Sequence, residues 1–287
     1  MHPTIPRVDR DEIVKTITNF YTFLTKLHIP ESALKHPPPG GWPNITPETT
    51  KHFNKSPFVV DLIKHLPYID ETYAREMITH IQYKCDVVDW SIRTAEDFAE
   101  EGASKYPTAE SGIRFWIDEI EEEQNGQGKT GGNDDKDHED NNDDESDGWG
   151  EEWEYFSPGE DPEVTDRTNL IGIAEGYESM GREFTLDVFK GVVYDDQIRC
   201  NFLGGSDVED FFQQLQEKFE KLELVPIRGE MLEGDSDDEE VNEFREVYRS
   251  HGWPGDDFRK EEALAAVEVV RQRREVDEEL RRARIDV

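Results

Sequence analysis

One acidic segment in the middle of the chain limits what the whole sequence can fold into. Residues 118–163 include 20 Asp or Glu and two Lys, which gives a net charge of −18. Residues 124–148 contain no aliphatic residue and no Phe, Tyr or Trp, so they cannot bury enough apolar surface to offset the entropy lost on folding. We therefore expect a disordered acidic insertion at 121–150, between a helical N-terminal part (1–120) and a strand-bearing part (151–228).

The charge of the whole chain limits the kind of partner that it can bind. The 287 residues include 32 Lys or Arg and 68 Asp or Glu, which gives a net charge of −36. Such a charge repels nucleic-acid phosphates and anionic membrane surfaces and attracts basic proteins. We expect a protein partner with basic character, no nucleic-acid partner and no membrane partner.

The cysteine count and the N-terminal sequence predict a reducing compartment. Cys85 and Cys200 are the only cysteines, too few for a disulfide framework or a four-thiolate zinc site. No N-terminal stretch resembles a signal peptide, and no apolar run has the length of a membrane span. We expect a cytoplasmic or nuclear protein that holds neither a metal nor an organic cofactor.

Two motifs inside the acidic segment resemble binding sites. "GQGKTGG" (126–132) contains the Gly-Lys-Thr of a phosphate-binding loop, but Glu123 stands where the first glycine is required and no buried strand precedes it. "DNNDDESDGWGEEWE" (140–154) matches the ligand positions of a calcium loop, yet Gly150 replaces the usual apolar residue and no entering helix precedes it. We expect no nucleotide site and no specific calcium site, only loose condensation of divalent ions.

The N-terminal part is predicted to be mostly helical. Apolar residues recur at helical spacing over 11–27. Two pairs, Thr46-Pro47 and Ser56-Pro57, combine a cap residue with a proline at the first helical position, and each predicts a helix start. "KCDVVDWSI" (84–92) favours a strand, whereas "GIRFWIDEIEE" (112–122) fits a helix or a strand.

Trp42 lies in a proline-rich segment, "KHPPPGGWPNITPE" (35–48), that is expected to be extended and stiff. Two interpretations are open. The segment either docks into an aromatic groove of a partner, or it packs against its own domain with Trp42 as the anchor. Trp42 is therefore a candidate interaction residue.

The strand-bearing part predicts an antiparallel sheet followed by a helix. Short apolar or alternating runs at 169–176, 182–189 and 192–203 are separated by turns. Ser206 and Glu209 then match a capping box, and an aromatic stripe at helical spacing follows. Such a stripe indicates a core helix packed on the sheet.

The same part contains no recognisable catalytic set. In "GYESMG" (176–181), Ser179 falls one residue too late for a nucleophile elbow. Asp195 and Asp196 are neighbours on a predicted strand, so their carboxylates point to opposite faces and do not form an acid–base pair. We expect no catalytic residue and no enzymatic activity.

Three consecutive stretches resemble a known superfamily. "TLDV" (185–188), "KGVVY" (190–194) and "VEDFFQQLQEKF" (208–219) resemble the C-terminal half of the SUKH superfamily, which includes the fungal cell-wall-assembly regulators. "GWPNITPE" and "HLPYI" resemble a group of uncharacterised fungal proteins with a similar strand-bearing half. The resemblance covers residues 165–225 well and 10–70 loosely. It implies an α+β fold with helices on one side of a mixed or antiparallel sheet, and a non-enzymatic protein-binding module.

Two acidic stretches contain candidates for interaction or regulation. Trp149, Trp153 and Tyr155 alternate with carboxylates. They either resume the folded domain or form a segment that folds on a basic or apolar partner. Ser236 lies in an expected acidic linker, 229–243, and precedes four acidic residues, a context that suits an acid-directed kinase.

Residues 244–287 predict a charged C-terminal helix. Its apolar residues are too sparse for a continuous heptad seam. A mostly solvated helix is expected, and docking onto a partner helix or onto the acidic insertion are the alternatives.

These features predict an α+β fold, with helices packed on one side of a small mixed or antiparallel sheet, a disordered acidic insertion and a C-terminal helix. The expected function is that of a non-catalytic protein-interaction or regulatory module of SUKH-like type. One alternative is an acidic chaperone or mimic that binds basic proteins through its insertion, and another is an unrecognised hydrolase.

Overall fold

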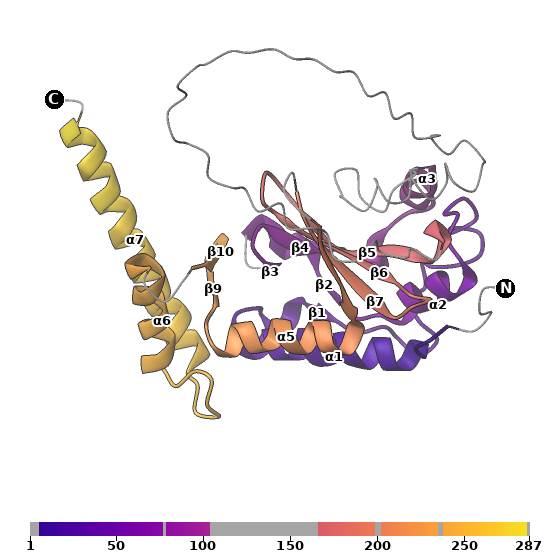
Figure 1. Cartoon of the computed structure of the whole chain (residues 1–287), viewed down its shortest axis with the longest axis horizontal. Helices are drawn as coiled ribbons and strands as arrows, with labels where there is room; N and C mark the ends of the chain where they lie inside the picture. Colours follow the sequence, from indigo (N-terminus) through magenta and orange to yellow (C-terminus); the bar gives the residue numbers. More distant parts are fainter. Residues whose placement is uncertain (1–5, 77–78, 104–165, 199–201, 235–237, 286–287) are drawn as a thin grey trace, which may run out of the picture.

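The structure, a computed structural model, describes residues 6–76, 79–103, 166–198, 202–234 and 238–285. These residues form one six-stranded antiparallel sheet, two small two-stranded sheets and the helices around them. Figure 1 shows helices α1 and α5 side by side along one face of the large sheet, with α6 and α7 beyond the ends of these two helices. The expected α+β class, with an antiparallel sheet and a C-terminal helix, is confirmed.

The large sheet is an antiparallel meander in which spatial order follows sequence order, β3-β4-β5-β6-β7-β8. Strands β4 and β5 are neighbours, with Cys85 opposite Gly176, so the N-terminal part and the strand-bearing part contribute to the same sheet. The strands are β3 (His80–Gln82), β4 (Cys85–Val87), β5 (Leu170–Gly176), β6 (Arg182–Asp187), β7 (Val192–Gln197) and β8 (Phe202–Asp207).

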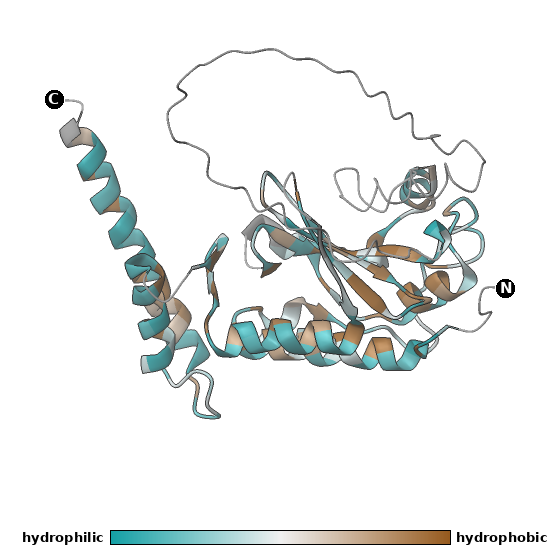
Figure 2. Cartoon of the chain, viewed as in Figure 1, coloured by the Kyte–Doolittle hydropathy of each residue, from teal (hydrophilic) through white to brown (hydrophobic). Residues whose placement is uncertain are grey.

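Helices α1 (Arg10–Leu27) and α5 (Val208–Glu220) bury their apolar stripes in the main core. Asp9 caps α1 in a capping box with Glu12. The two helices meet through aromatic rings, with the Phe20 and Phe212 centroids 5.0 Å apart. From α5, Phe211 also contacts Phe184 of β6 at 4.8 Å. Figure 2 shows hydrophobic residues, in brown, on both helices and on the strands of the sheet.

The start of α5 differs from the predicted capping box at Ser206. The helix begins at Val208, and its N-cap Asp207 makes no side-chain capping hydrogen bond. Ser206 is still paired with Val193 in the sheet, and the backbone N–H of Val208 donates to the carbonyl of Gly191 at 2.9 Å. Strand β8 therefore runs directly into α5, and the turn between β6 and β7 provides the acceptor for the first amide of the helix.

The remaining elements before β5 are short. Helix α2 (Pro57–His65) begins as predicted, with the Ser56 side chain accepting a hydrogen bond from Val59 N. The predicted helix at Thr46-Pro47 is a turn, in which Thr46 bonds to Thr49 and Thr50. The other elements are η1 (Glu31–Ala33), β1 (Leu34–Lys35), β2 (Tyr68–Ile69), η2 (Glu71–Glu76), η3 (Trp90–Ile92), α3 (Ala95–Ala103) and η4 (Arg167–Asn169).

The C-terminal region contains more structure than one charged helix after a linker. Strands β9 (Leu224–Ile227) and β10 (Glu230–Glu233) form a hairpin, so β10 lies within the segment expected to be an acidic linker. Helices α6 (Glu239–Ser250) and α7 (Lys260–Ile285) follow and form a helical hairpin.

Helix α7 changes character along its length. Near its start Ala263 and Val267 are buried, whereas Val276 and Leu280 are more than half exposed. Figure 2 shows that its C-terminal half is largely hydrophilic. The expectation of a solvated helix therefore fits the second half of α7, while the first half belongs to the core. Among the described helices, none combines the length and the apolar character that a membrane span requires.

Several predictions concern residues outside those that the structure describes. They are the helix or strand at 112–122, the disordered acidic insertion at 121–150, the two binding-site motifs, and the candidates Trp149, Trp153, Tyr155 and Ser236.

Candidate functional site

The α6–α7 hairpin is attached to the C-terminal ends of α1 and α5 by hydrogen bonds to their last carbonyl groups. Lys260 Nζ donates to the carbonyl oxygens of Thr25 and Ile29, both at 2.8 Å. Trp253, in the loop between α6 and α7, donates its indole N–H to the carbonyl of Phe219 at 3.0 Å. Because a helix leaves its last carbonyls unpaired, Lys260 satisfies a group at the end of α1. Trp253 adds a second donor to the Phe219 carbonyl, which also accepts from the backbone N–H of Leu222.

Helix α6 is held against β9 by a second set of buried contacts. Arg245 Nε donates to the carbonyl of Leu222 at 2.8 Å, and the Tyr248 hydroxyl donates to the carbonyl of Pro226 at 2.6 Å. Both side chains are buried. The hairpin is thus fixed on two sides, and the loop between α6 and α7 has a defined position opposite the ends of α1 and α5.

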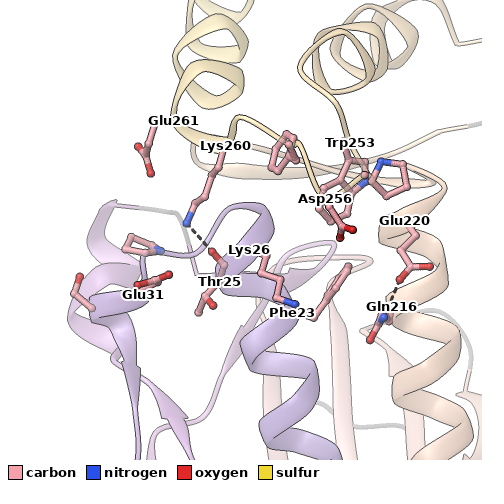
Figure 3. Close-up of a pocket in the computed structure, with 15 residues that line it drawn as sticks. Phe23, Thr25, Lys26, Glu31, Gln216, Glu220, Trp253, Asp256, Lys260 and Glu261 are labelled. Carbon is pink, nitrogen blue, oxygen red and sulfur yellow. Dashed lines mark hydrogen bonds between the residues drawn. The ribbon is translucent and has the colours of Figure 1, made fainter.

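Between this loop and the ends of α1 and α5 lies an open cleft of about 1080 Å³, which we call the acidic cleft. Figure 3 shows side chains from α1, α5, the hairpin loop and the start of α7 around it. Residues distant in sequence, such as Lys26 and Asp256, therefore line one site.

Three aromatic rings form a continuous apolar wall of the acidic cleft. Trp253 is buried and contacts Phe23 at 5.7 Å and Phe258 at 5.0 Å between ring centroids. Phe23 and Phe258 are only half buried, so part of each ring is open to the cleft. The prolines Pro30 and Pro254 also line it. Such a wall can pack against the aliphatic stem of a long side chain.

Carboxylates dominate the polar side chains of the acidic cleft. Glu31, Glu220, Asp256 and Glu261 line it, against two basic residues, Lys26 and Lys260. In Figure 3, Glu31 and Glu261 lie toward Lys260, and Asp256 and Glu220 lie toward Trp253. The full set of labelled polar residues in that view is Thr25, Lys26, Glu31, Gln216, Glu220, Asp256, Lys260 and Glu261.

Most of these carboxylates are available for a partner. Glu31, Asp256 and Glu261 are exposed, and within the part of the chain that the structure describes none of them forms an ion pair with a basic side chain. Glu220 accepts a hydrogen bond from Gln216 at 2.8 Å. With four carboxylates against two lysines, the cleft presents a net negative charge.

The backbone adds to this negative potential. Helices α1 and α5 both end on the side of the α6–α7 hairpin (Figure 1), and residues near these ends line the cleft. The C-terminus of a helix carries a partial negative charge. Lys260 and the N-terminus of α7, which begins at this residue and carries a partial positive charge, offset part of it. Burial lowers the pKa of Lys260, although Glu261 and Glu31 act in the opposite direction. The acidic cleft is therefore suited to cationic groups.

Trp42, the one described interaction candidate from the sequence, is not part of this cleft. Its indole N–H donates to the carbonyl of Leu66 at 2.8 Å, and its ring lies 5.8 Å from that of Tyr68. Trp42 is thus anchored on its own domain, and its role in binding stays a prediction. None of the cleft residues was predicted from the sequence. The available signal was "HGWPGDDF" (251–258), an aromatic and acidic turn between two charged helices.

The sequence motifs weighed for catalysis lie at the sheet. Ser179 is exposed in the turn that joins β5 to β6, so it does not stand between a strand and a helix as a nucleophile elbow requires. Asp195 is held by Arg182, whose Nε lies 3.0 Å from Oδ1. Burial raises the pKa of Asp195, and Arg182 acts against this shift. In the described parts of the chain, no cluster of three or more His, Cys, Asp or Glu could hold a metal ion.

No family model, no curated protein and no solved structure matches the chain. What the protein binds therefore has to be inferred from the chemistry of its own surface, of which the acidic cleft is the most distinctive part.

Proposed function

We propose that the protein is a non-catalytic protein-interaction module that binds a basic segment of a partner protein in the acidic cleft. The observation that carries the proposal is the set of three exposed, unpaired carboxylates, Glu31, Asp256 and Glu261, around an aromatic wall. Lys and Arg match both parts, because their charged heads pair with carboxylates while their stems pack on apolar surface. Arg also stacks on aromatic faces.

The charge of the whole chain supports the same partner. A net charge of −36 steers basic proteins toward the surface and disfavours acidic ones. Steering raises the rate of association, whereas the cleft supplies the specific contacts. The two effects have different signatures, because steering weakens with salt and packing against the aromatic wall does not.

The SUKH resemblance supports a binding role of this kind. The three stretches that carry it lie at the end of β6, in the turn before β7 and the start of β7, and in helix α5. Strand β8 lies between β7 and α5 in the same sheet. The superfamily resemblance implies a protein-binding module without catalytic residues, and SUKH-like membership is part of the proposal.

The proposal can be tested by selecting binders for the full chain from a random-peptide library. Enriched peptides are expected to be rich in Lys and Arg. Their affinity should fall by about tenfold or more for the cleft variant, Glu31→Gln/Asp256→Asn/Glu261→Gln. A matched control variant, Glu48→Gln/Glu100→Gln/Asp277→Asn, removes the same charge from exposed positions outside the cleft and should bind nearly as well as the unaltered chain.

The same experiment distinguishes the acidic-chaperone alternative. If binding survives in the cleft variant but is lost when residues 121–150 are deleted, the acidic insertion is the binding element and the proposal is overturned. If binding depends on the cleft and survives the deletion, the insertion is accessory.

A further inference from the structure

A second pocket lies against the acidic cleft, on the other side of Lys260. Its volume is about 420 Å³, and its apolar walls come from β9 and the start of α7, through Pro226, Ile227, Leu264 and Val267. The two hollows share three lining residues, Pro30, Lys260 and Glu261. They therefore adjoin each other, and we call the smaller one the apolar pocket.

We propose that the apolar pocket takes one large apolar side chain from the same basic segment that occupies the acidic cleft. The inference rests on the proposed function and specifies its partner: a segment in which an aliphatic or aromatic residue stands at a fixed distance from Lys or Arg.

The charge of the apolar pocket separates it from the acidic cleft. Its charged lining residues are two basic, Arg228 and Lys260, and two acidic, Glu261 and Glu268. Glu268 is already held by Arg271, with contacts of 2.7 and 2.9 Å. His28 also lines the pocket and is neutral at physiological pH, because burial lowers its pKa to about 3. A further cation gains little here, whereas an apolar side chain gains from leaving water.

The boundary between the two hollows is held by several contacts. Lys260 is fixed by its two hydrogen bonds to the end of α1, and the adjoining turn of α7 is fixed through buried Ala263 and Val267. The apolar pocket and the acidic cleft therefore exist side by side before binding. When an extended partner segment fills both hollows, few side chains of this protein have to become ordered. Such preorganisation favours affinity.

The apolar pocket has room for one large side chain. Its volume of about 420 Å³ lies at the small end of the range for ligand pockets. In an extended segment, successive side chains point to opposite faces and residues two apart share a face. One residue can therefore enter the pocket while a nearby Lys or Arg reaches the acidic cleft.

The test is a double-mutant cycle on the strongest peptide from the library selection. Leu264→Trp fills the apolar pocket from α7, and replacing the peptide's apolar residue by Ala removes its occupant. Each change alone should weaken binding by about tenfold. The two changes together should weaken it little more than either change alone. Val269→Trp, at an exposed position of the same helix, is the control and should leave binding unchanged. Thermal unfolding checks that Leu264→Trp is folded. If it is not, Ile227→Trp replaces it in the cycle, because Ile227 lines the same pocket from β9.

The outcomes separate this inference from the proposed function. Two outcomes would overturn the role of the apolar pocket and leave binding in the acidic cleft untouched. In one, the selected basic peptides have no apolar residue at a fixed position. In the other, the affinity losses from the two changes simply multiply. A selection that yields no basic peptides would overturn both. A fixed apolar position, together with losses that do not multiply, supports both.

Discussion

The indole N–H of Trp253 donates a hydrogen bond to the carbonyl oxygen of Phe219, 3.0 Å away, in the last turn of α5. The same ring contacts Phe23 of α1, with centroids 5.7 Å apart. One side chain of the hairpin loop therefore contacts the ends of both helices and forms part of the wall of the acidic cleft. The cleft depends on how the C-terminal hairpin is attached to the sheet-and-helix unit.

Removing the indole N–H of Trp253 should weaken both the fold and the cleft. Trp253→Phe keeps an aromatic ring but leaves the Phe219 carbonyl without this donor, which should lower the free energy of unfolding by about 1–2 kcal/mol. Denaturant unfolding measures this loss. The affinity for a basic peptide should also fall, because the loop loses one of its attachments to α5.

Trp42→Phe is the matched control for that change. It removes an equivalent bond, from the indole N–H to the carbonyl of Leu66, outside the cleft. The loss of stability should be similar, without a change in peptide affinity. Equal effects of the two substitutions on peptide binding would contradict the role assigned to Trp253.

Replacing Lys260 should have opposite effects on stability and on binding. Lys260→Met removes the two hydrogen bonds to the end of α1 and should lower the free energy of unfolding by about 1–3 kcal/mol. It also removes a positive charge from the cleft, so a basic peptide should bind a few times more tightly at low salt.

Lys26→Met separates these two effects. Lys26 lines the same cleft, is exposed, and bonds to no other described residue through its ammonium group. Its replacement should tighten peptide binding with almost no loss of stability. Weaker peptide binding in both lysine variants would show that the cleft does not select for positive charge.

The stability of the fold should decrease below neutral pH because of His28. Burial lowers the pKa of His28 from 6.5 to about 3, and its bond to the carbonyl of His80 only partly opposes this. Below pH 6.5 the unfolded chain takes up a proton that the folded chain does not bind, so acid favours unfolding. The contribution is fully present above pH 6.5 and is lost progressively toward pH 3.

The expected size of this effect is about 2 kcal/mol between pH 7 and pH 5. Denaturant unfolding across that range measures it. His28→Gln keeps a donor for the His80 carbonyl and should remove most of the dependence of the unfolding free energy on pH. Burial also lowers the pKa of His80, and this histidine supplies part of the remaining dependence. His36→Gln, at an exposed position, is the control. A slope that His28→Gln leaves unchanged would contradict the assignment.

Two neighbouring residues in the β5–β6 turn should respond in opposite directions. A Cβ at Gly181 would lie 2.5 Å from the Tyr177 carbonyl oxygen and 2.9 Å from that of Lys84, so Gly181→Ala should cost about 1–3 kcal/mol of stability. Met180 is half exposed and has a φ of +70°, which glycine adopts more easily. Met180→Gly should therefore be neutral or stabilising by about 0.5 kcal/mol. Thermal unfolding of the two variants gives the comparison.

The elements that could be predicted from the sequence are those whose signal is local. The apolar spacing from Ile13 to Leu24 predicts α1, the Ser56-Pro57 pair predicts the start of α2, and the aromatic stripe that begins at Phe211 predicts α5. Each depends on residues within a few turns of one another. The antiparallel order of β5, β6 and β7 follows in the same way from their short connections.

The features that could not be predicted depend on contacts between distant segments. The pairing of Cys85 with Gly176 joins strands that lie far apart in the sequence. The missing cap at Ser206 follows from its place in the sheet. The acidic cleft forms where Lys260 and Trp253 dock on helix ends more than 30 residues away, and no local pattern encodes such docking.

The measurement that tests the central claim most directly is the affinity of one selected basic peptide for three forms of the full-length protein. These are the unaltered chain, the cleft variant Glu31→Gln/Asp256→Asn/Glu261→Gln, and the control variant Glu48→Gln/Glu100→Gln/Asp277→Asn. We predict a loss of about tenfold or more in the cleft variant and nearly unchanged affinity in the control. Equal losses in both variants would mean that net charge alone attracts the peptide, and would contradict binding in the acidic cleft.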